Sequence, residues 1–286
     1  MAQSGSDSEH LEPDEQAQAA AFEPLRAKII HEILRKEGES ELQRTLDALI
    51  WSGLAAGLSM GFSFALQALL HSGLPDAPWR SLVASLGYPL GFVIIVLGRQ
   101  QLFTESTLTT VLPLLTRRDL KTGLSILRLW GAVLASNIIG TWIFAAALAY
   151  GHPFRADVTP SLVQLATEAV EGSFWSTILK GIFAGWLIAL MVWLLPSARS
   201  ASLFVIMLLT YVVSLAHLPH IIAGSSEAAY AVLSGHRPFA DYWTVFFLPT
   251  LIGNTIGGVS LVALLNHAPV SSELEGSSEG KGDSQA

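Results

Sequence analysis

Two glutamates and a histidine lie inside stretches of sequence that are otherwise strongly apolar. Glu105 belongs to the segment LFTES, and Glu227 lies in HLPHIIAGSSE, where Pro219 stands directly before His220. An imidazole can donate a hydrogen bond to an anion and can change its charge near neutral pH. Because an ionisable side chain inside a hydrophobic span is costly, it marks a candidate functional site. The alternative for His220 is a purely structural role, in which the buried ring is bonded to a carbonyl group.

The composition indicates that these residues belong to a membrane protein. The chain has 286 residues, of which 51% are hydrophobic and 14% are charged, whereas soluble domains average about 25% charged residues. Most charges lie in residues 1–45 and 267–286, so the net charge of −7 comes largely from the two ends. This distribution argues against a nucleic-acid partner. The absence of cysteine excludes disulfides, thiol catalysis and thiolate metal sites.

Six apolar segments follow the amino-terminal region, and two of them have unusual lengths. We place the segments at roughly 47–71, 81–116, 123–150, 173–195, 201–234 and 241–266. A membrane span needs about 20 residues, so the second and fifth segments are too long for one straight helix and too short for two. Both contain polar residues near the middle. We therefore predict broken helices, whose irregular backbone must be buried in protein or line a wet cavity.

Short motifs recur three segments apart along the chain. GLAAG in the first segment corresponds to GIFAG in the fourth, and SNIIG in the third corresponds to GNTIG in the sixth. Since each half has an odd number of spans, the two halves must face opposite sides of the membrane. This plan is typical of channels and transporters, with the functional site at the helix breaks. The predicted fold is an all-α membrane protein with six transmembrane helices in two inverted three-helix repeats.

Lysine and arginine content predicts the orientation of the spans. The loops at 117–121 (RRDLK) and 196–200 (PSARS) and the amino-terminal segment are rich in basic residues, which places them in the cytoplasm. Both termini are then cytoplasmic. The predicted organisation is a disordered acidic tail (1–20), an amphipathic cytoplasmic helix (21–45), a transmembrane channel domain (46–267) and a disordered tail (268–286).

The amino-terminal amphipathic helix has two interpretations. Leu25, Ile29, Ile30 and Ile33 recur at helical spacing beside basic residues. Such a helix lies on the membrane surface or packs against its own bundle.

The charged residues near the breaks also have alternative roles. Glu105 and Glu227 follow Ser or Thr residues where helices are expected to restart, so they contact substrate or are stabilised by the helix dipole. Lys180 lies early in the fourth span. It pairs with one of these glutamates, attracts anions into a pore, or extends its ammonium group to the membrane surface.

Other residues near the breaks suggest a constriction but no catalytic centre. Leu102 and Phe103 precede Thr104 and could form an apolar ring that excludes hydrated ions, although ordinary packing explains them equally well. The spacing of His217 and His220 is unspecific for a metal, and Glu227 is the only evident third ligand, so we predict no metal and no cofactor. Neither His-Glu-x-x-His nor Gly-x-Ser-x-Gly is present, which argues against an enzyme.

The motifs together resemble the formate/nitrite transporter family. GRQQLFTESTL resembles the family's first pore loop, HIIAGSSE resembles its second break, and GIFAGWLIALMVWL and LPTLIGNTIGGVSLVALL resemble its fourth and sixth spans. The match covers roughly residues 47–267. It implies an aquaporin-like homopentamer of the bacterial inner membrane, in which each subunit conducts small monovalent anions such as formate or nitrite, with or without a proton. It also implies functional roles for Leu102, Phe103, Thr104 and His220.

Several positions depart from the family pattern. The family's two pore asparagines match Gly185 and Gly224, and its loop acid matches Gln101. Glu105 stands in place of a small residue, and Lys180 in place of an apolar one. The sequence is therefore similar to a divergent branch, in which the hydrogen bonding and charge of the pore are altered around a retained histidine.

The sequence supports one principal function and two alternatives. The principal hypothesis is a channel or transporter for a small anion or its weak acid, working through His220. A channel for water or another neutral solute is the first alternative, although Asn-Pro-Ala motifs are absent. The second is a non-conducting membrane sensor that signals through the amino-terminal helix.

Overall fold

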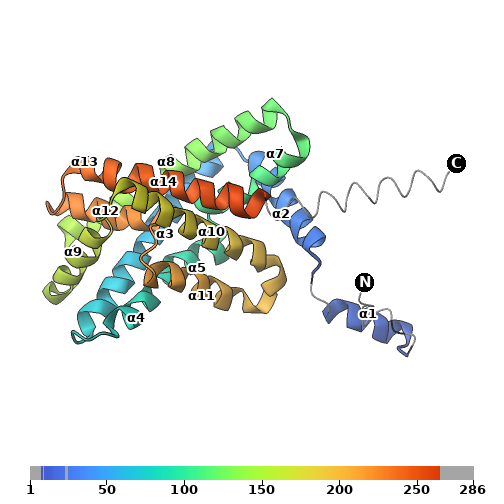
Figure 1. Cartoon of the computed structure of the whole chain (residues 1–286), viewed down its shortest axis with the longest axis horizontal. Helices are drawn as coiled ribbons and strands as arrows, with labels where there is room; N and C mark the ends of the chain where they lie inside the picture. The colour runs from blue at the N-terminus through green and yellow to red at the C-terminus, as the bar shows by residue number, and fades with distance from the viewer. Residues whose placement is uncertain (1–7, 9, 23–24, 265–286) are drawn as a thin grey trace.

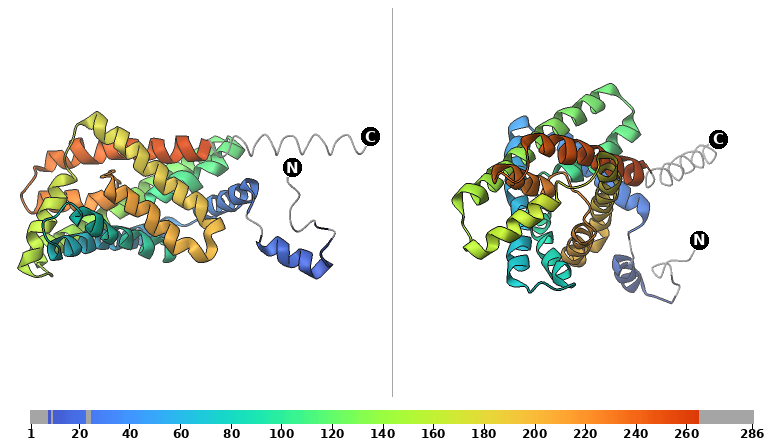
Figure 2. Two further views of the ribbon diagram at one scale, coloured as in Figure 1. Left: turned by 60° about the horizontal axis from the view of Figure 1, so that its bottom comes forward. Right: turned by 60° about the vertical axis from the view of Figure 1, so that its left-hand side comes forward.

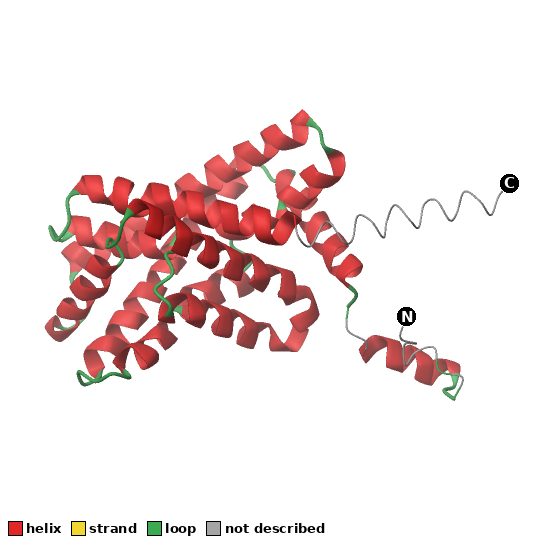
Figure 3. Ribbon diagram, in the orientation of Figure 1, coloured by secondary structure: helices red, strands yellow, loops and turns green. Residues whose placement is uncertain are grey.

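The structure, a computed structural model, describes residues 8, 10–22 and 25–264. Within these residues every regular element is a helix (Figure 3). The predicted tail at 268–286 lies outside the described residues. A helix, α1 (Pro13–Phe22), occupies part of the amino-terminal segment that the sequence predicted to be disordered.

The helices follow the six predicted apolar segments closely. The first half of the chain contains α2 (Ala27–Leu42), α3 (Leu46–Gly73), α4 (Arg80–Ala84), η2 (Ser85–Gly87), α5 (Pro89–Leu97), α6 (Phe103–Thr109), α7 (Val111–Arg117) and α8 (Leu120–Gly151). The second half contains η3 (Ala156–Val158), α9 (Thr159–Glu168), α10 (Phe174–Ala198), η4 (Arg199–Ala201), α11 (Ser202–Leu215), α12 (Ala223–Leu233), α13 (Phe239–Asp241), η5 (Tyr242–Phe247), α14 (Leu248–Ile256) and η6 (Gly257–Leu264).

Four helical stretches among the described residues are long and apolar enough to cross a membrane. They are Leu46–Gly73, Arg80–Leu97, Leu120–Gly151 and Phe174–Leu215, the last of which comprises α10, η4 and α11. Their amino ends carry side-chain caps where the sequence provides them: Thr45 accepts from the backbone N–H of Ala48 and begins α3, and Asp119 begins α8 by accepting from Thr122. The chain is an integral membrane protein.

Both predicted helix breaks are confirmed, and they share one backbone geometry. Each begins with a residue in the left-handed conformation, Arg99 (φ 53°) after α5 and His217 (φ 49°) after α11. The next residue then donates its backbone N–H five residues back, from Gln100 to Ile95 and from Leu218 to Val213, in both cases at 3.0 Å. This is the Schellman pattern of a helix end, so each break is an ordered turn.

The helices run between two distinct ends of the bundle. Figure 1 shows α2 and α7 at one end and α4, α9 and α13 at the other, and the left view of Figure 2 shows the long helices connecting the two ends. The basic loops expected in the cytoplasm lie at the α2 end, because α7 leads directly into RRDLK.

The amphipathic helix α2 packs against the bundle, on α6, α7 and α10. Its buried face is formed by Ile30, His31, Leu34 and Gly38. The predicted apolar face was therefore partly wrong, since Ile29 and Ile33 are 45% and 41% exposed. A Cβ atom at Gly38 would overlap the backbone carbonyl of Thr109, so glycine permits the close approach of α2 to α6.

Candidate functional site

The two broken helices meet at a hydrogen bond between Thr104 and His220. Thr104 is the second residue of α6, and His220 lies just before α12. The distance from Thr104 Oγ1 to His220 Nε2 is 2.9 Å, and the residues are only 2% and 1% exposed. Two residues that are distant in the sequence thus form one buried polar contact at the centre of the bundle.

The hydrogen bonds of His220 define which ring nitrogen carries the hydrogen atom. The backbone N–H of Ala223 donates to Nδ1 at 3.2 Å, so Nδ1 is an acceptor. The hydrogen atom is therefore assigned to Nε2, which donates to Thr104 Oγ1. Phe92 packs edge-on against the ring at 5.0 Å between centroids. This geometry fits a neutral imidazole, because a second hydrogen on Nδ1 would face the Ala223 N–H.

Two asparagines, Asn137 on α8 and Asn254 on α14, hold the backbone at the breaks. Asn137 accepts the backbone N–H of Phe103 at 3.0 Å and donates to the carbonyl oxygens of Gln101 and Gly53 at 3.0 and 2.7 Å. Both asparagines are fully buried. The sequence analysis did not assign them a role, although they occupy equivalent places in the repeated motifs SNIIG and GNTIG.

Asn254 makes the same three contacts in the second half of the chain. It accepts the backbone N–H of Ile221 at 2.8 Å and donates to the carbonyl oxygens of Pro219 and Gly181 at 3.0 and 2.9 Å. Asn137 spans the break around Leu102, and Asn254 spans the break around His220. The side chains of Leu102 and His220 therefore occupy equivalent positions in the two breaks. One of them is apolar and the other is polar.

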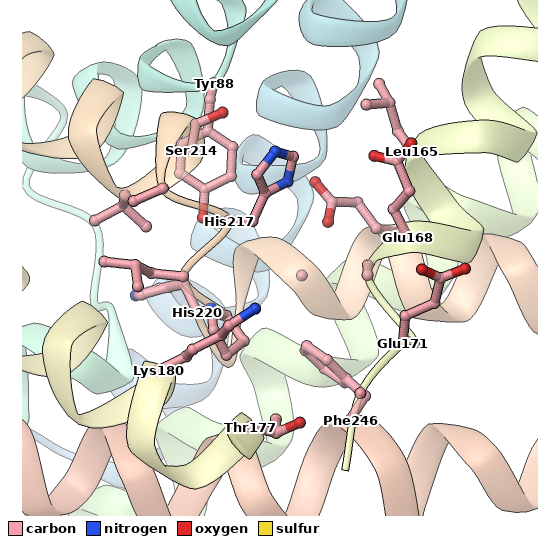
Figure 4. Close-up of a pocket in the computed structure, with 18 of the residues that line it drawn as sticks. Tyr88, Leu165, Glu168, Glu171, Thr177, Lys180, Ser214, His217, His220 and Phe246 are labelled. Atoms are coloured by element: carbon pink, nitrogen blue, oxygen red, sulfur yellow. The ribbon is translucent and has the colours of Figure 1, made fainter. Parts of the chain in front are cut away.

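A cavity of about 720 Å³ opens from the α9 end and reaches His220. Figure 4 shows Lys180, His217, Glu168 and Tyr88 around it, and Glu227 also contributes to its lining. We call it the α9-side cavity. Lys180 forms no ion pair with any described residue. The ammonium group therefore remains available to a ligand in the cavity.

A second cavity, of about 920 Å³, opens at the α2 end and includes Gln101 and Glu105 in its lining. We call it the α2-side cavity. Lys180 and Glu105, which the sequence offered as an ion pair, thus line different cavities. The Thr104–His220 bond lies between the two, because His220 lines one and the neighbours of Thr104 line the other.

Helix α2 contributes a residue to this second cavity that the sequence analysis missed. The carboxylate of Glu41 accepts a hydrogen bond of 2.7 Å from Thr109 Oγ1 on α6. Arg44 donates to the amide oxygen of Gln101 at 2.6 Å. Glu41 stands among many polar residues of an amphipathic helix, so its sequence context gives no signal that it reaches the break.

The other residues that the sequence analysis proposed for the pore lie in different surroundings. Leu102 is fully buried, and Phe103 packs edge-on against Trp130 of α8 at 5.7 Å between ring centroids. Gly224 lines the α9-side cavity, where a Cβ atom would lie 2.6 Å from the ring of Phe246. Gly185 instead packs on α14, since a Cβ there would overlap the carbonyl oxygen of Asn254. The structure does not place Gly185 in the lining of either cavity.

A buried polar contact between cavities at opposite ends of a helical membrane bundle defines a channel or transporter. Comparison with known proteins agrees: the family model described as "Formate/nitrite transporter" matches residues 28–268. The chain belongs to the formate/nitrite transporter family.

Individual relatives and solved structures are consistent with this assignment. The chain is 40% identical over 251 residues to the "Inner membrane protein YfdC" of Escherichia coli strain K12, covering 88% of this chain and 81% of that protein. It is 28% identical to the "Formate channel BtFdhC" of Bacillus thuringiensis, covering 82% and 91%. A solved "Pentameric formate channel with formate bound" has the same fold, with a TM-score of 0.65, 19% identity and coverage of 81% and 96%.

Proposed function

We propose that the chain conducts small monovalent anions, or their conjugate weak acids, across a bacterial inner membrane as a homopentamer with one pathway in each subunit. Residues 46–267 form the channel, and both termini lie in the cytoplasm with the α2-side cavity. The observation that carries this proposal is the Thr104–His220 bond between the two cavities. The relatives named as formate channels and the pentameric structure support the substrate class and assembly.

The geometry suggests how an anion would pass. An anion entering the α9-side cavity meets the unpaired ammonium of Lys180 and then His220. Thr104 Oγ1 accepts from the imidazole, so its own hydroxyl hydrogen is free to donate to a substrate oxygen. Proton uptake by the anion would allow it to pass the apolar layer at Leu102 as a neutral acid, because a charge at this depth is costly.

The decisive experiment measures flux through the purified protein in proteoliposomes. A panel of formate, nitrite, acetate, lactate and hydrosulfide at two pH values identifies the substrate, and osmotic swelling with uncharged solutes tests the neutral-solute alternative. We expect His220→Leu to reduce anion flux by about tenfold or more, because a positioned donor between the two cavities is lost. His220→Asn retains a donor and should keep a larger part of the flux.

Two results would contradict the proposal. One is an unchanged flux and pH response in the folded His220→Leu protein. The other is swelling with neutral solutes but no anion flux in the wild-type protein, which would favour a neutral-solute channel.

A further inference from the structure

We propose that Glu41 and Glu105 together hold a proton that substrate anions take up when they enter from the α2-side cavity. This inference rests on the proposed function and deepens it, because it assigns a proton donor to one entrance. Both residues line that cavity, but they come from different elements, α2 and α6. The sequence alone suggested a dipole or substrate role for Glu105 and none for Glu41.

Glu105 lies next to the central polar contact. It directly follows Thr104, whose hydroxyl group bonds to His220. Its Oε1 atom is buried and has no hydrogen-bond partner among the described residues. The charge of an ionised carboxylate in that position would lack the hydrogen bonds that offset the cost of burial. A protonated carboxyl group is neutral and costs less free energy to bury.

Glu41 brings a second carboxyl group to the same wall of the cavity. Thr109, which donates to Glu41 at 2.7 Å, is one helical turn after Glu105 on α6. Within the described part of the chain, neither glutamate forms an ion pair with a basic side chain. The two carboxyl groups are also close enough for the charge of Glu41 to act on Glu105.

Two neighbouring carboxyl groups that form no direct ion pair resist ionising together. Burial raises the pKa of Glu41 to about 7, and the hydrogen bond from Thr109 only partly opposes this effect. The pair therefore retains a proton at neutral pH. It can release this proton to an anion that has left bulk water, because desolvation also raises the proton affinity of the anion.

The other charged groups of the cavity favour the approach of an anion. Glu37 faces it from α2 and Arg44 from the turn between α2 and α3, while Arg99 follows α5 and Arg199 follows α10. Arg99 pairs with Glu37 at 3.0 Å, and Arg44 is bonded to the neutral amide of Gln101. If the glutamate pair holds one proton, the pair carries one negative charge and Glu37 carries another. The three arginines then give the cavity a net charge of +1.

The transfer step is balanced without any further reactant. An anion in the cavity accepts the proton as the O–H bond of the carboxyl pair breaks, and a new bond to the anion forms. The neutral acid then passes the layer at Leu102, and the pair is left with one additional negative charge. A proton from water in the α2-side compartment restores the pair.

The test compares Glu41→Gln/Glu105→Gln with the wild-type protein in proteoliposomes, using formate and acetate as probes. The amide groups preserve shape and hydrogen bonding but carry no exchangeable acid proton. We expect flux from the α2 side to fall about tenfold or more, because the positioned proton donor is lost. Its dependence on pH at that side should also become weaker.

Matched variants separate this effect from a change in folding. Glu32→Gln removes a carboxylate from the same helix, but Glu32 is outside the cavity lining and pairs with Arg35 at 2.6 Å, so its flux should equal that of the wild type. Glu105→Asp retains an acid and should recover part of the flux. A double variant with wild-type flux and pH profile overturns the inference but not the proposed function.

Infrared spectroscopy gives a readout that does not depend on transport. The wild-type protein at neutral pH should show the carbonyl stretch of protonated carboxyl groups, and the double variant should lose the part of this band that comes from the pair. If the wild-type and double-variant spectra are identical, the pair does not hold the proton. A wild-type protein that carries no anion under any condition contradicts the proposed function instead.

Discussion

Thr104 and His220 show what single residues reveal and what only their geometry adds. Their chemistry is evident in the sequence, because polar groups at predicted helix breaks are expected to face a cavity or buried protein. Their hydrogen bond is a property of the fold, since more than one hundred residues separate them along the chain. The structure also assigns the directions: the imidazole donates, and the threonine hydroxyl keeps a free hydrogen atom.

This direction leads to a prediction for Thr104. Thr104→Val should reduce anion flux by about tenfold or more, because it removes both the acceptor of His220 Nε2–H and the free hydroxyl hydrogen. Thr104→Ser preserves the hydroxyl group and should retain most of the flux. The measurement is initial uptake in proteoliposomes, and equal rates for the valine and serine variants would exclude a role for the hydroxyl group.

Asn137 and Asn254 mark the limit of sequence-based inference at the residue scale. An asparagine inside an apolar span is visible in the sequence, but the three backbone groups that each one binds come from two other elements. Glu41 was missed for a related reason: its partner Thr109 lies on α6 and becomes adjacent only when α2 packs there.

At the scale of elements, the repeated small-residue motifs mark close helix crossings. Gly57 of α3 lies against the backbone of Asn137 on α8, and Gly185 of α10 lies against that of Asn254 on α14. The sequence correctly indicated which spans repeat. It also suggested that Gly185 replaces a pore residue, whereas the structure places it at the helix crossing that positions Asn254.

Substitution of Gly185 should therefore affect stability before it affects selectivity. In Gly185→Ala the new methyl group overlaps the carbonyl oxygen of Asn254, so α10 and α14 must separate. We expect a loss of about 1–3 kcal/mol in the free energy of unfolding, measured by thermal denaturation in detergent. Gly123→Ala on α8 is the control, because nothing lies within 4 Å of that position, and it should be neutral or slightly stabilising.

The two breaks were predicted correctly because their cause is local. Each combines an apolar stretch of impossible length with polar residues that cannot be left against lipid. The face of α2 was predicted less well, since a helical stripe shows that one side is buried but not against what. The close approach at Gly38 rotates the buried face toward Ile30 and Leu34 and leaves Ile29 and Ile33 exposed.

For the whole molecule, the channel body and α2 form one packed unit with a large apolar exterior. Large exposed apolar side chains lie on several membrane helices, including Trp51 on α3 and Phe204 on α11. Lipid and, in the proposed pentamer, neighbouring subunits would cover such surfaces. Helix α2 differs from these helices, because polar contacts attach it to the body as well as apolar packing. They include the hydrogen bond from Thr109 to Glu41 and the ion pair of Glu39 with Arg117.

This attachment predicts how the stability of the whole molecule depends on pH. The pKa of Glu41 is raised by burial to about 7, above its value in an unfolded chain, so the folded protein binds more protons than the unfolded one between about pH 4.5 and 7. The contribution of Glu41 to stability is therefore full at low pH and is lost as pH rises through 7. Glu41→Gln, which remains neutral, should remove this loss.

Thermal denaturation at about pH 5 and about pH 8.5 measures the effect. Glu41→Gln should match the wild-type melting temperature at the lower pH and exceed it by roughly 2–6 °C at the higher pH. Glu32→Gln should show no such gain, because its hydrogen bond to Arg35 lowers the pKa of Glu32. If Glu41→Gln gains nothing at the higher pH, then Glu41 is already solvated when α2 is packed. In that case Glu41 does not make the attachment of α2 depend on pH, and the carboxyl pair has no buried proton to transfer.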